Sequence, residues 1–415
     1  MSRTITLLAG AAFSAIAGSA ATSAQAQTTE LSFLAAEYSA VSLPFWEKVV
    51  ADFEAANPDI DVTLEVVGWN VMHDTTAQRI AAGQMPDLVN TATIWVPEWV
   101  DADAIQPLSP ALVSAAKQAE FVPALFEKGA EYNGQSWGLP IAAAGRAVFF
   151  NEAIFEQAGL DVADPPKTWA EFKDAIVAIH EKTGVFGFAY DAKGVRAFRN
   201  FGFFLWNNGG DFFNADGTAA FNSPAGAEAM AFIVDLAKTA AIPDPTGTTL
   251  EDFQPMFEVG RVAMMTSGNF AMASIKENAP DIEFGVMAVP VKDTSVPPVT
   301  WGVTDTLVIS KDAPAEASAK FIDYIFSPAV RTEFDTGEGM LPVLIAQNSD
   351  PVFADDAKVK AFIDMIPSAR FDPLHPQYAQ MQELVKTAMQ EALAGTDPQA
   401  ALDKAAAEFD ALVNQ

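Results

Sequence analysis

The sequence predicts an α/β protein with two lobes, each built on a parallel sheet. The chain has 415 residues, too many for one ordinary hydrophobic core, and half of them are hydrophobic. Strand-like and helix-like patterns alternate near the N-terminus, which is typical of a parallel sheet covered by helices. The segment Tyr132–Asn151 carries a single charge, Arg146, and joins two strand-like runs. Such a smooth connection suits a chain that passes from one lobe to another.

The N-terminus has the pattern of a secretory signal peptide. Arg3 supplies the positive start, Ile5–Ala17 is apolar, and Ala24-Gln25-Ala26 is a cleavage signal. A membrane anchor is the alternative, but the apolar run is too short to span a bilayer. The chain has no cysteine, which excludes disulfides, thiol catalysis and a lipid-anchored N-terminal cysteine. We therefore expect a soluble protein of the periplasm, with residues 1–26 removed.

The charge balance excludes several partners. Lys and Arg number 24 and Asp and Glu number 54, so the formal net charge is −30. A field of this sign repels nucleic acid and anionic lipid. It favours solubility, and we expect a monomer.

The first elements alternate regularly. The predicted order is a strand at Leu31–Ala35, a helix at Pro44–Ala56, a strand at Ile60–Val66, a helix at Thr75–Ala82 and a strand at Asp87–Asn90. Ligands of open α/β sheets lie beyond the carboxyl ends of the strands. This rule predicts that five residues lie at a cleft: Glu37, Tyr38, Asn90, Thr91 and Trp95.

The segment around Arg146 is predicted as two short strands with a connector. Gln135–Leu139 forms the first strand, and Pro140 ends it because proline has no N–H for the ladder. Ile141–Gly145 is the alanine-rich connector, and Ala147–Phe150 is the second strand. On these residues alone, an ordinary connection within one sheet is the simpler interpretation.

The rest of the chain continues the mixed pattern. Thr168 is positioned to cap a helix, and Ser223-Pro224 opens another. The remaining expected elements are helices at Trp169–Lys182, Ala225–Ala240 and Ala315–Phe326, strands at Gly184–Tyr190, Val262–Thr266, Phe284–Pro290 and Val299–Ser310, and two tail helices within Pro376–Asn414.

Several segments together resemble the extracellular solute-binding proteins of ABC sugar importers, of the maltodextrin-binding type. The matches around the connector are Tyr132, Gly134, Gly138-Leu139-Pro140, Phe150-Asn151, Phe155, Ala158-Gly159-Leu160, Pro166, Thr168-Trp169 and Glu171. Others are Phe53-Glu54, Asn57-Pro58, Ala82–Leu88, the run from Gly209 to Pro224, Phe257–Phe270, Phe284–Pro290 and Ser327-Pro328. The resemblance covers nearly the whole mature chain.

This resemblance implies the periplasmic-binding-protein fold, with a ligand in the cleft between two lobes. It implies a hinge of three crossings, which we place near Leu139–Gly145, Pro298–Thr304 and Pro328–Val343. The first lobe would comprise residues 27–143 and 302–330, and the second residues 144–301 and 331–415. The implied partners are a carbohydrate and a membrane permease of an ABC transporter.

A carbohydrate site needs aromatic plates and polar side chains that bind hydroxyl groups. The candidate plates are Trp95, Trp206, Phe270 and Trp301, and packing in a core is the alternative for each. Phe270 matches the aromatic residue that stacks on sugar in the family, and Gly268 belongs to the same motif. The candidate polar partners are Glu37, Tyr38, Asn90, Thr91, Asp191, Asn208 and Asp305.

Two arginines raise a separate possibility. Arg146 and Arg370 could each pair with a nearby carboxylate in this acidic chain, or could bind an anionic group of the ligand. The family often has a carboxylate two residues before the position of Arg146, where this chain has Ala144. An anionic sugar derivative, such as a uronate or a sulfonated or phosphorylated sugar, is therefore an alternative ligand.

Catalysis has little support in the sequence. No metalloprotease, nucleophile-elbow or nucleotide-binding motif is present, and the three histidines, His73, His180 and His375, are far apart. We expect no catalytic residues, no metal and no cofactor. A secreted carbohydrate hydrolase with paired carboxylates remains the alternative from another functional class.

Overall fold

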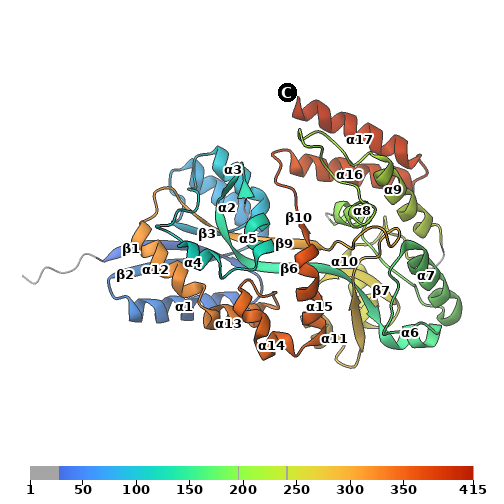
Figure 1. Ribbon diagram of the computed structural model, residues 1–415, viewed down its shortest axis with the longest axis horizontal. Coiled ribbons are helices and arrows are strands. Elements are labelled where there is room, and N and C mark those ends of the chain that lie inside the picture. The colour runs from blue at the N-terminus through green and yellow to red at the C-terminus, as the bar shows by residue number, and fades with distance from the viewer. Residues whose placement is uncertain (1–27, 130, 195, 240–241, 415) are drawn as a thin grey trace, which may run out of the picture.

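The computed structural model describes residues 28–129, 131–194, 196–239 and 242–414, and it has two lobes joined by long strands (Figure 1). The predicted signal peptide lies outside the described residues. Within them, one sheet runs through both lobes in the order β2-β1-β3-β9-β6-β7, with β10 beside β9 and β8 beside β6. The sheet is therefore the common frame on which both lobes are built.

The first lobe contains the predicted parallel strands. β1 (Thr29–Glu37) pairs in parallel with both β2 (Ile60–Gly68) and β3 (Leu88–Ala92). The crossover helices are α1 (Ser42–Ala56) and α2 (Trp69–Ala81). α1 buries Trp46, Val49 and Phe53 and ends before Asn57-Pro58, as the sequence predicted.

The remaining elements of this lobe surround the sheet. They are η1 (Thr93–Trp95), α3 (Val96–Asp101), α4 (Ala115–Gln118), α5 (Pro123–Gly129), the hairpin β4 (Glu131–Tyr132) and β5 (Gln135–Ser136), α12 (Ala315–Ile325), α13 (Pro328–Glu338) and η2 (Ile345–Ser349). The hairpin turns at Asn133 and Gly134, which both have positive φ angles, 52° and 71°.

The central connection differs from the prediction. β6 (Gly138–Asn151) is one strand, not two short strands with a connector. It pairs with β9 (Trp301–Ile309) up to Gly145, with β7 (Met264–Gly268) from Arg146 and with β8 (Phe284–Met287) from Val148. Pro140 is accommodated beside an irregularity in the β6–β9 register, where a missing N–H is tolerated. Alanine and glycine are poor strand formers, but neighbours on both edges hold them extended.

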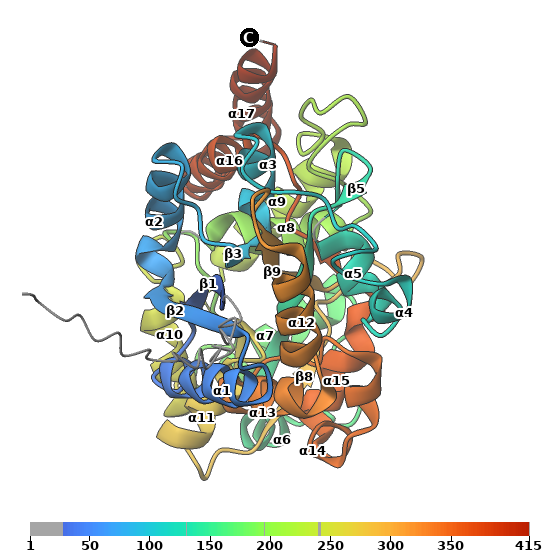
Figure 2. The same cartoon turned by 90° about the vertical axis from the view of Figure 1, so that its left-hand side faces the viewer.

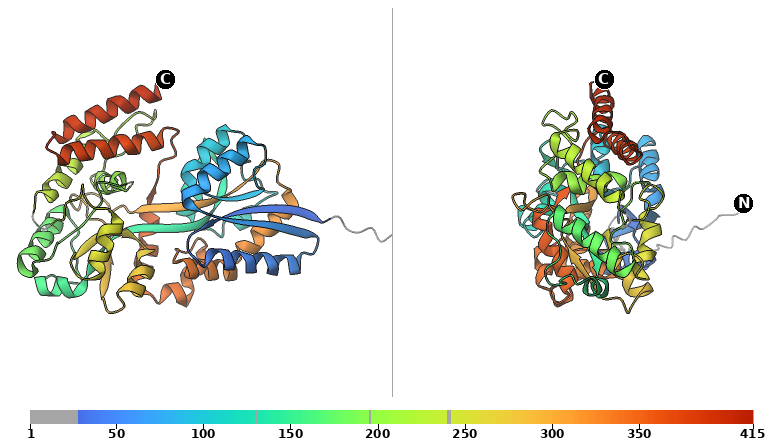
Figure 3. Two further views of the ribbon diagram at one scale, coloured as in Figure 1. Left: turned by 180° about the vertical axis from the view of Figure 1, so that it is seen from behind. Right: turned by 90° about the vertical axis from the view of Figure 1, so that its right-hand side faces the viewer.

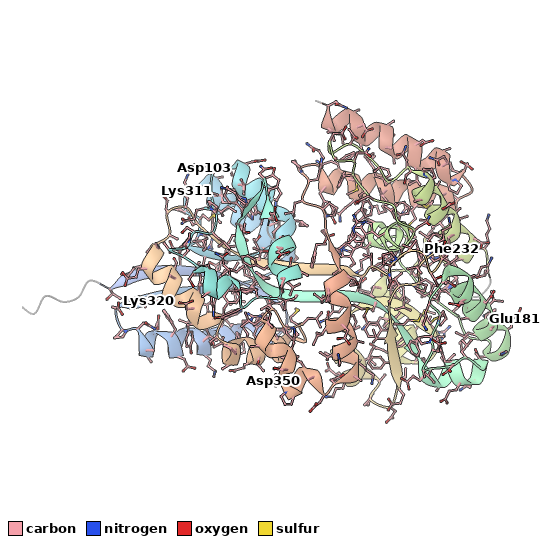
Figure 4. All side chains as sticks on the ribbon, viewed as in Figure 1. Asp103, Glu181, Phe232, Lys311, Lys320 and Asp350 are labelled. Carbon is pink, nitrogen blue, oxygen red and sulfur yellow. The ribbon has the colours of Figure 1, made fainter. Side chains whose placement is uncertain are left out.

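The third crossing occurs later in the chain than predicted. α13 packs against α1 and α12, and the Ile345 N–H donates to the Glu120 carbonyl at 2.8 Å. The chain then passes through α14 (Pro351–Ala354), capped by Asp350, to α15 (Ala357–Met365), which packs on β6 and β8. Figure 4 labels Asp350 below the junction of the lobes. We therefore propose that residues 331–349 belong to the first lobe.

The second lobe contains β7 (Met264–Gly268) and β8 (Phe284–Met287), both antiparallel to β6. Its other elements are α6 (Glu152–Ala158), α7 (Trp169–Thr183), α8 (Ala197–Trp206), α9 (Pro224–Ala237), α10 (Leu250–Glu258), α11 (Ala271–Asn278), η3 (Ile366–Ser368), β10 (Arg370–Phe371), α16 (Tyr378–Leu393) and α17 (Pro398–Val413). Thr168 forms the predicted capping box of α7, and Ser223 caps α9. The predicted strand Gly184–Tyr190 is reduced to isolated bridges at Phe186 and Ala189.

The tail helices complete the second lobe. α16 packs against α8 and α9, and α17 packs against α9 and α16 (Figure 3). Seen end-on from the first lobe, α16 and α17 stand above the sheet, while α1 and α13 lie below it (Figure 2). α16 thereby brings side chains of the C-terminal region toward α2 and α3 of the first lobe.

Candidate functional site

Two cavities contain predicted site residues. The larger of the two is a groove of about 630 Å³ with walls from both lobes. The wall from the first lobe comprises His73, Ile94, Trp95, Pro97, Glu98 and Asp101. The wall from the second lobe comprises His375, Pro376, Tyr378, Ala379, Gln380 and Gln382. These segments are nearly 300 residues apart in sequence, so the groove exists only because the hinge sets the lobes face to face.

Aromatic rings and a histidine are grouped on the first wall. The His73 ring lies 5.3 Å from the Trp99 ring and 5.0 Å from the Trp95 ring. Its Nε2 is 2.8 Å from the Glu98 carboxylate. Burial opposes the charged form of His73, but the hydrogen bonds to Glu98 and Asp74 outweigh it and raise the pKa. This wall therefore combines an apolar surface with polar groups, which is what a sugar requires.

A smaller pocket lies where β6 and β7 meet α8. Its volume is about 20 Å³, and its lining is Arg146, Asp191, Arg196, Arg199, Asn200, Phe203, Leu250, Phe253, Thr266, Ser267, Gly268 and Phe270. β6 and β7 place Arg146 opposite Gly268, and the guanidinium of Arg146 lies 4.9 Å from the centre of the Phe270 ring. The pocket is thus built at the residue where β6 exchanges its first-lobe partner for its second-lobe partner.

Asp372 connects the two cavities. Arg199 donates to both Asp372 carboxylate oxygens, at 3.0 and 3.3 Å, and the Tyr378 hydroxyl donates to one of them. Arg199 lines the smaller pocket, and Tyr378 lines the groove. The two cavities are therefore linked through the partners of one carboxylate, Asp372.

A second polar cluster lies where β9 meets β3. The Tyr38 hydroxyl donates to Asp305 at 2.8 Å and lies 3.3 Å from Asn90. Burial raises the pKa of Asp305 to about 7, although the Tyr38 hydrogen bond and the charge of Arg146 act in the opposite direction. Burial also raises the pKa of Tyr38 well above its usual value. The cluster brings together three of the predicted polar residues.

The structure separates the other predicted residues from these cavities. Trp206 and Trp301 are 2% and 0% exposed, and their ring centres are 4.1 Å apart in the core of the second lobe. They therefore offer no face to a ligand in this conformation. Trp301 begins β9 at the predicted crossing, but the sequence could not indicate the side of the sheet to which it turns.

Three predicted polar partners also have other neighbours. Thr91 is buried and accepts a hydrogen bond from the indole of Trp99 at 3.2 Å. Asn208 donates to the Ala225 carbonyl and to Glu228, both at 2.9 Å. Glu37 is exposed at the end of β1 and lines neither cavity.

The two predicted arginines have different surroundings. Arg370 forms an ion pair with Asp211 and lies 4.8 Å from the centre of the Trp206 ring. This is the pairing with a neighbouring carboxylate that the sequence offered as an alternative. Arg146 forms no ion pair with any carboxylate among the described residues, and its Nη1 is buried without a partner.

Sequence reasoning missed several residues of both cavities. Arg196, Arg199, Asn200 and Ser267 line the smaller pocket, and His73 and Tyr378 line the groove. The Arg- and Phe-rich run from Asp191 to Phe204 was the available signal. The pattern did not separate pocket residues from core residues, because α8 is buried at nearly every position.

Among the described residues, no group of three or more His, Asp or Glu side chains is arranged to hold a metal ion. None of the described helices has the length and apolar character needed to cross a bilayer.

Comparison with known proteins gives consistent matches. A putative binding protein of Brucella abortus (strain 2308) is 32% identical over 413 residues, which cover 99% of this chain and 98% of that protein. The sn-glycerol-3-phosphate-binding periplasmic protein of Escherichia coli O1:K1 is 24% identical over 348 residues, covering 77% of this chain and 78% of that protein. A solute-binding protein of an ABC transporter from Thermotoga lettingae, solved with α-D-tagatose, is 27% identical with a TM-score of 0.76, covering 92% of this chain and 99% of that one.

The family model named bacterial extracellular solute-binding protein matches residues 39–332. This match includes most of both lobes and two strands that join them, β6 and β9. The chain therefore belongs to the family of bacterial extracellular solute-binding proteins.

Proposed function

We propose that this protein captures a carbohydrate between its lobes in the periplasm and delivers it to the permease of an ABC importer. The observation that carries the proposal is the groove of about 630 Å³, with one wall from each lobe. A ligand that contacts both walls binds the closed arrangement better than the open one. Such a ligand shifts the population toward closure, and the permease then recognises the closed form.

The chemistry of the groove suits a sugar. Trp95 offers an apolar ring for the C–H face of a pyranose or furanose. Glu98, Asp101, Gln380 and Gln382 offer acceptors and donors for hydroxyl groups from the two walls. The related Thermotoga lettingae protein holds tagatose, which supports a ligand of monosaccharide or oligosaccharide type.

Thermal unfolding with a panel of mono- and oligosaccharides tests the proposal. A ligand present at 100 times its Kd stabilises the folded state by about 2.7 kcal/mol, which raises the Tm measurably. Small-angle scattering with the same sugar should show a smaller radius of gyration. Trp95→Ala should weaken the binding, whereas Trp169→Phe, a change at a stacked core residue, should leave the affinity unchanged. No stabilisation by any sugar would contradict the proposal.

A secreted hydrolase is the alternative from another class. The proposal predicts that the bound sugar is recovered intact after long incubation, as judged by mass spectrometry. Release of shorter products by the purified protein would favour the hydrolase instead.

A further inference from the structure

The smaller pocket contains an unusual concentration of unsatisfied polar atoms. Arg146 Nη1, Arg199 Nε, Ser267 Oγ and Asp191 Oδ2 are buried and have no hydrogen-bond partner among the described residues. All four residues line this pocket, and Asp191 and Ser267 are only 1% and 3% exposed. Leaving a buried polar atom unpaired costs roughly 1–3 kcal/mol, so four such atoms around one cavity indicate a missing partner.

Three of the four atoms are donors. The Arg146 and Arg199 nitrogens carry hydrogen and positive charge, and the Ser267 hydroxyl can turn its hydrogen toward the cavity. The fourth, Asp191 Oδ2, is an acceptor, whose other oxygen already receives the backbone N–H groups of Lys193 and Gly194 at 2.8 and 2.6 Å. The set fits an oxyanion next to a hydroxyl group.

The cationic side chains differ in what they already bind. Arg196 pairs with Glu251 at 2.7 Å, and Arg199 pairs with Asp372 at 3.0 Å. Arg146 alone of the three has no carboxylate partner among the described residues. In a chain of net charge −30, a buried arginine that lacks a carboxylate partner and shares a pocket with two other arginines favours an external anion.

The backbone provides space for the guanidinium of Arg146. A Cβ atom at position 268 would lie 2.3 Å from Arg146 Nη1, so only glycine permits the present position of the side chain. Phe270 covers the guanidinium from the side, at 4.9 Å from its ring centre. The fold therefore leaves room for the guanidinium in the pocket, beside the Phe270 ring.

The electrostatics agree with this geometry. Burial and the repulsion of Arg199 lower the pKa of Arg146 to about 9, although Asp372 and Asp305 favour its charged form. A bound anion would relieve the repulsion between the two arginines. It would also give Arg146 the counter-charge that the described residues do not supply.

We propose that the pocket binds the oxyanion group of a negatively charged sugar, a carboxylate, sulfonate or phosphate. This inference rests on the function proposed above and specifies its substrate class. Arg146 Nη1, Arg199 Nε and Ser267 Oγ donate to the anion, and Asp191 Oδ2 accepts from an adjacent sugar hydroxyl. The volume of about 20 Å³ holds little more than one water-sized group, so one oxygen of the anion enters the pocket and the sugar ring lies outside it.

Calorimetry with matched sugars tests the substrate class. The panel contains neutral hexoses and the uronate, 6-phosphate and 6-sulfonate of each, at fixed ionic strength. We expect at least one charged sugar to bind about 10- to 150-fold more tightly than its neutral parent, the factor for one charged hydrogen bond. The three charged forms distinguish a planar carboxylate from a tetrahedral anion.

Variants then locate the anion. Arg146→Gln should abolish the preference for the charged sugar, and Gly268→Ala should reduce it because it displaces the guanidinium without removing charge. Arg370→Gln is the matched control outside the pocket and should retain the preference. As a probe without a sugar, sulfate, phosphate or acetate at constant ionic strength should raise the Tm of the wild type more than that of Arg146→Gln.

The outcomes separate the two proposals. Equal affinity for charged and neutral sugars, unaffected by Arg146→Gln, would overturn the anion site and leave carbohydrate capture intact. Failure of every sugar, with anions stabilising the wild type and Arg146→Gln equally, would overturn both. Stabilisation by simple anions through Arg146, without any sugar binding, would overturn carbohydrate capture and retain the anion site.

Discussion

Two arginines next to the strand β6 differ in their counter-charge. Both have buried nitrogens without a hydrogen-bond partner among the described residues, Nη1 of Arg146 and Nε and Nη1 of Arg331. Arg331, on α13, is fully buried, donates to the Ile141 carbonyl at 2.6 Å and pairs with Asp335 at 2.5 Å. Gln347 donates to the other oxygen of Asp335 at 2.8 Å. Arg146, on β6 itself, has an aromatic ring beside it, as Arg331 has Phe334, but it has no carboxylate partner.

This difference indicates different roles. A buried charge with its counter-charge in the same chain holds the fold, because removing either member leaves the other uncompensated. A positioned charge without a counter-charge among the described residues is available to a ligand. We therefore infer that the ion pair of Arg331 stabilises the fold of the first lobe, and that Arg146 is available to bind a ligand.

The largest expected effect is on the paired region. Asp335→Ala should lower the free energy of unfolding by about 3–5 kcal/mol, because Arg331 remains buried without its carboxylate. Urea denaturation measures the change. Asp364→Ala breaks the exposed pair between Lys360 and Asp364, which also has i,i+4 spacing, and should cost less than about 0.5 kcal/mol. Equal effects of the two variants would contradict a structural role for Arg331.

The second prediction concerns the protonation of Asp305, where burial opposes the charge of Arg146. The pKa of Asp305 is raised to about 7 in the folded protein, above the unfolded value of about 3.9. The folded state thus binds more protons between these values, and stability decreases as the pH rises from about 4 to about 7. Asp305→Asn should remove this decrease, so that the variant gains about 3 kcal/mol relative to the wild type between pH 4.5 and pH 8.

The control for this pH dependence is Asp103→Asn, at an exposed carboxylate 2.7 Å from Lys311 (Figure 4). It should show almost no pH-dependent difference from the wild type. If the charge of Arg146 outweighed burial, the pKa of Asp305 would be low instead. The wild type would then gain stability relative to Asp305→Asn as the pH rises to about 4, which would contradict the prediction.

The third prediction tests the connection between the two regions. Asn269 accepts from the Gly145 N–H at 3.0 Å and donates to the Gly339 carbonyl at 2.6 Å. It thereby links β6 with the end of α13. Asn269→Ala should cost about 1–3 kcal/mol, because two buried backbone groups lose their partners. Ser267→Ala, two residues away, should cost less than about 0.5 kcal/mol without ligand, because its hydroxyl has no partner to lose.

The sequence predicted the parts of this arrangement that depend on local patterns. The order of strands and helices in the first lobe and the caps at Thr168 and Ser223 follow from periodicity and turn chemistry. It did not predict that β6 is continuous, because its alanines become a strand only through pairing with β9 and β7. It also could not predict that Trp301 turns into the core.

The predicted site shows the same limit. Arg146, Asp191, Gly268 and Phe270, which were separate predictions, lie in one pocket, and whether they bind a ligand remains a prediction. Arg199 and Ser267 were missed, because what distinguishes each is a buried polar atom without a hydrogen-bond partner. Only the folded structure reveals that feature. The sequence also offered Arg146 and Arg370 as equivalent, whereas Asp211 lies beside only one of them in the fold.

The smallest expected effect is on the stability of the ligand-free protein. Arg146→Met removes a charge that is already destabilised by burial and by Arg199, and it retains an apolar side chain beside Phe270. We expect the free energy of unfolding to change by less than about 1 kcal/mol in either direction. Arg331→Met, the same substitution in the paired region, should cost about 3–5 kcal/mol because Asp335 stays buried and alone. A comparable loss in both variants, measured by urea denaturation without ligand, would show that Arg146 also holds the fold and is not reserved for an anion.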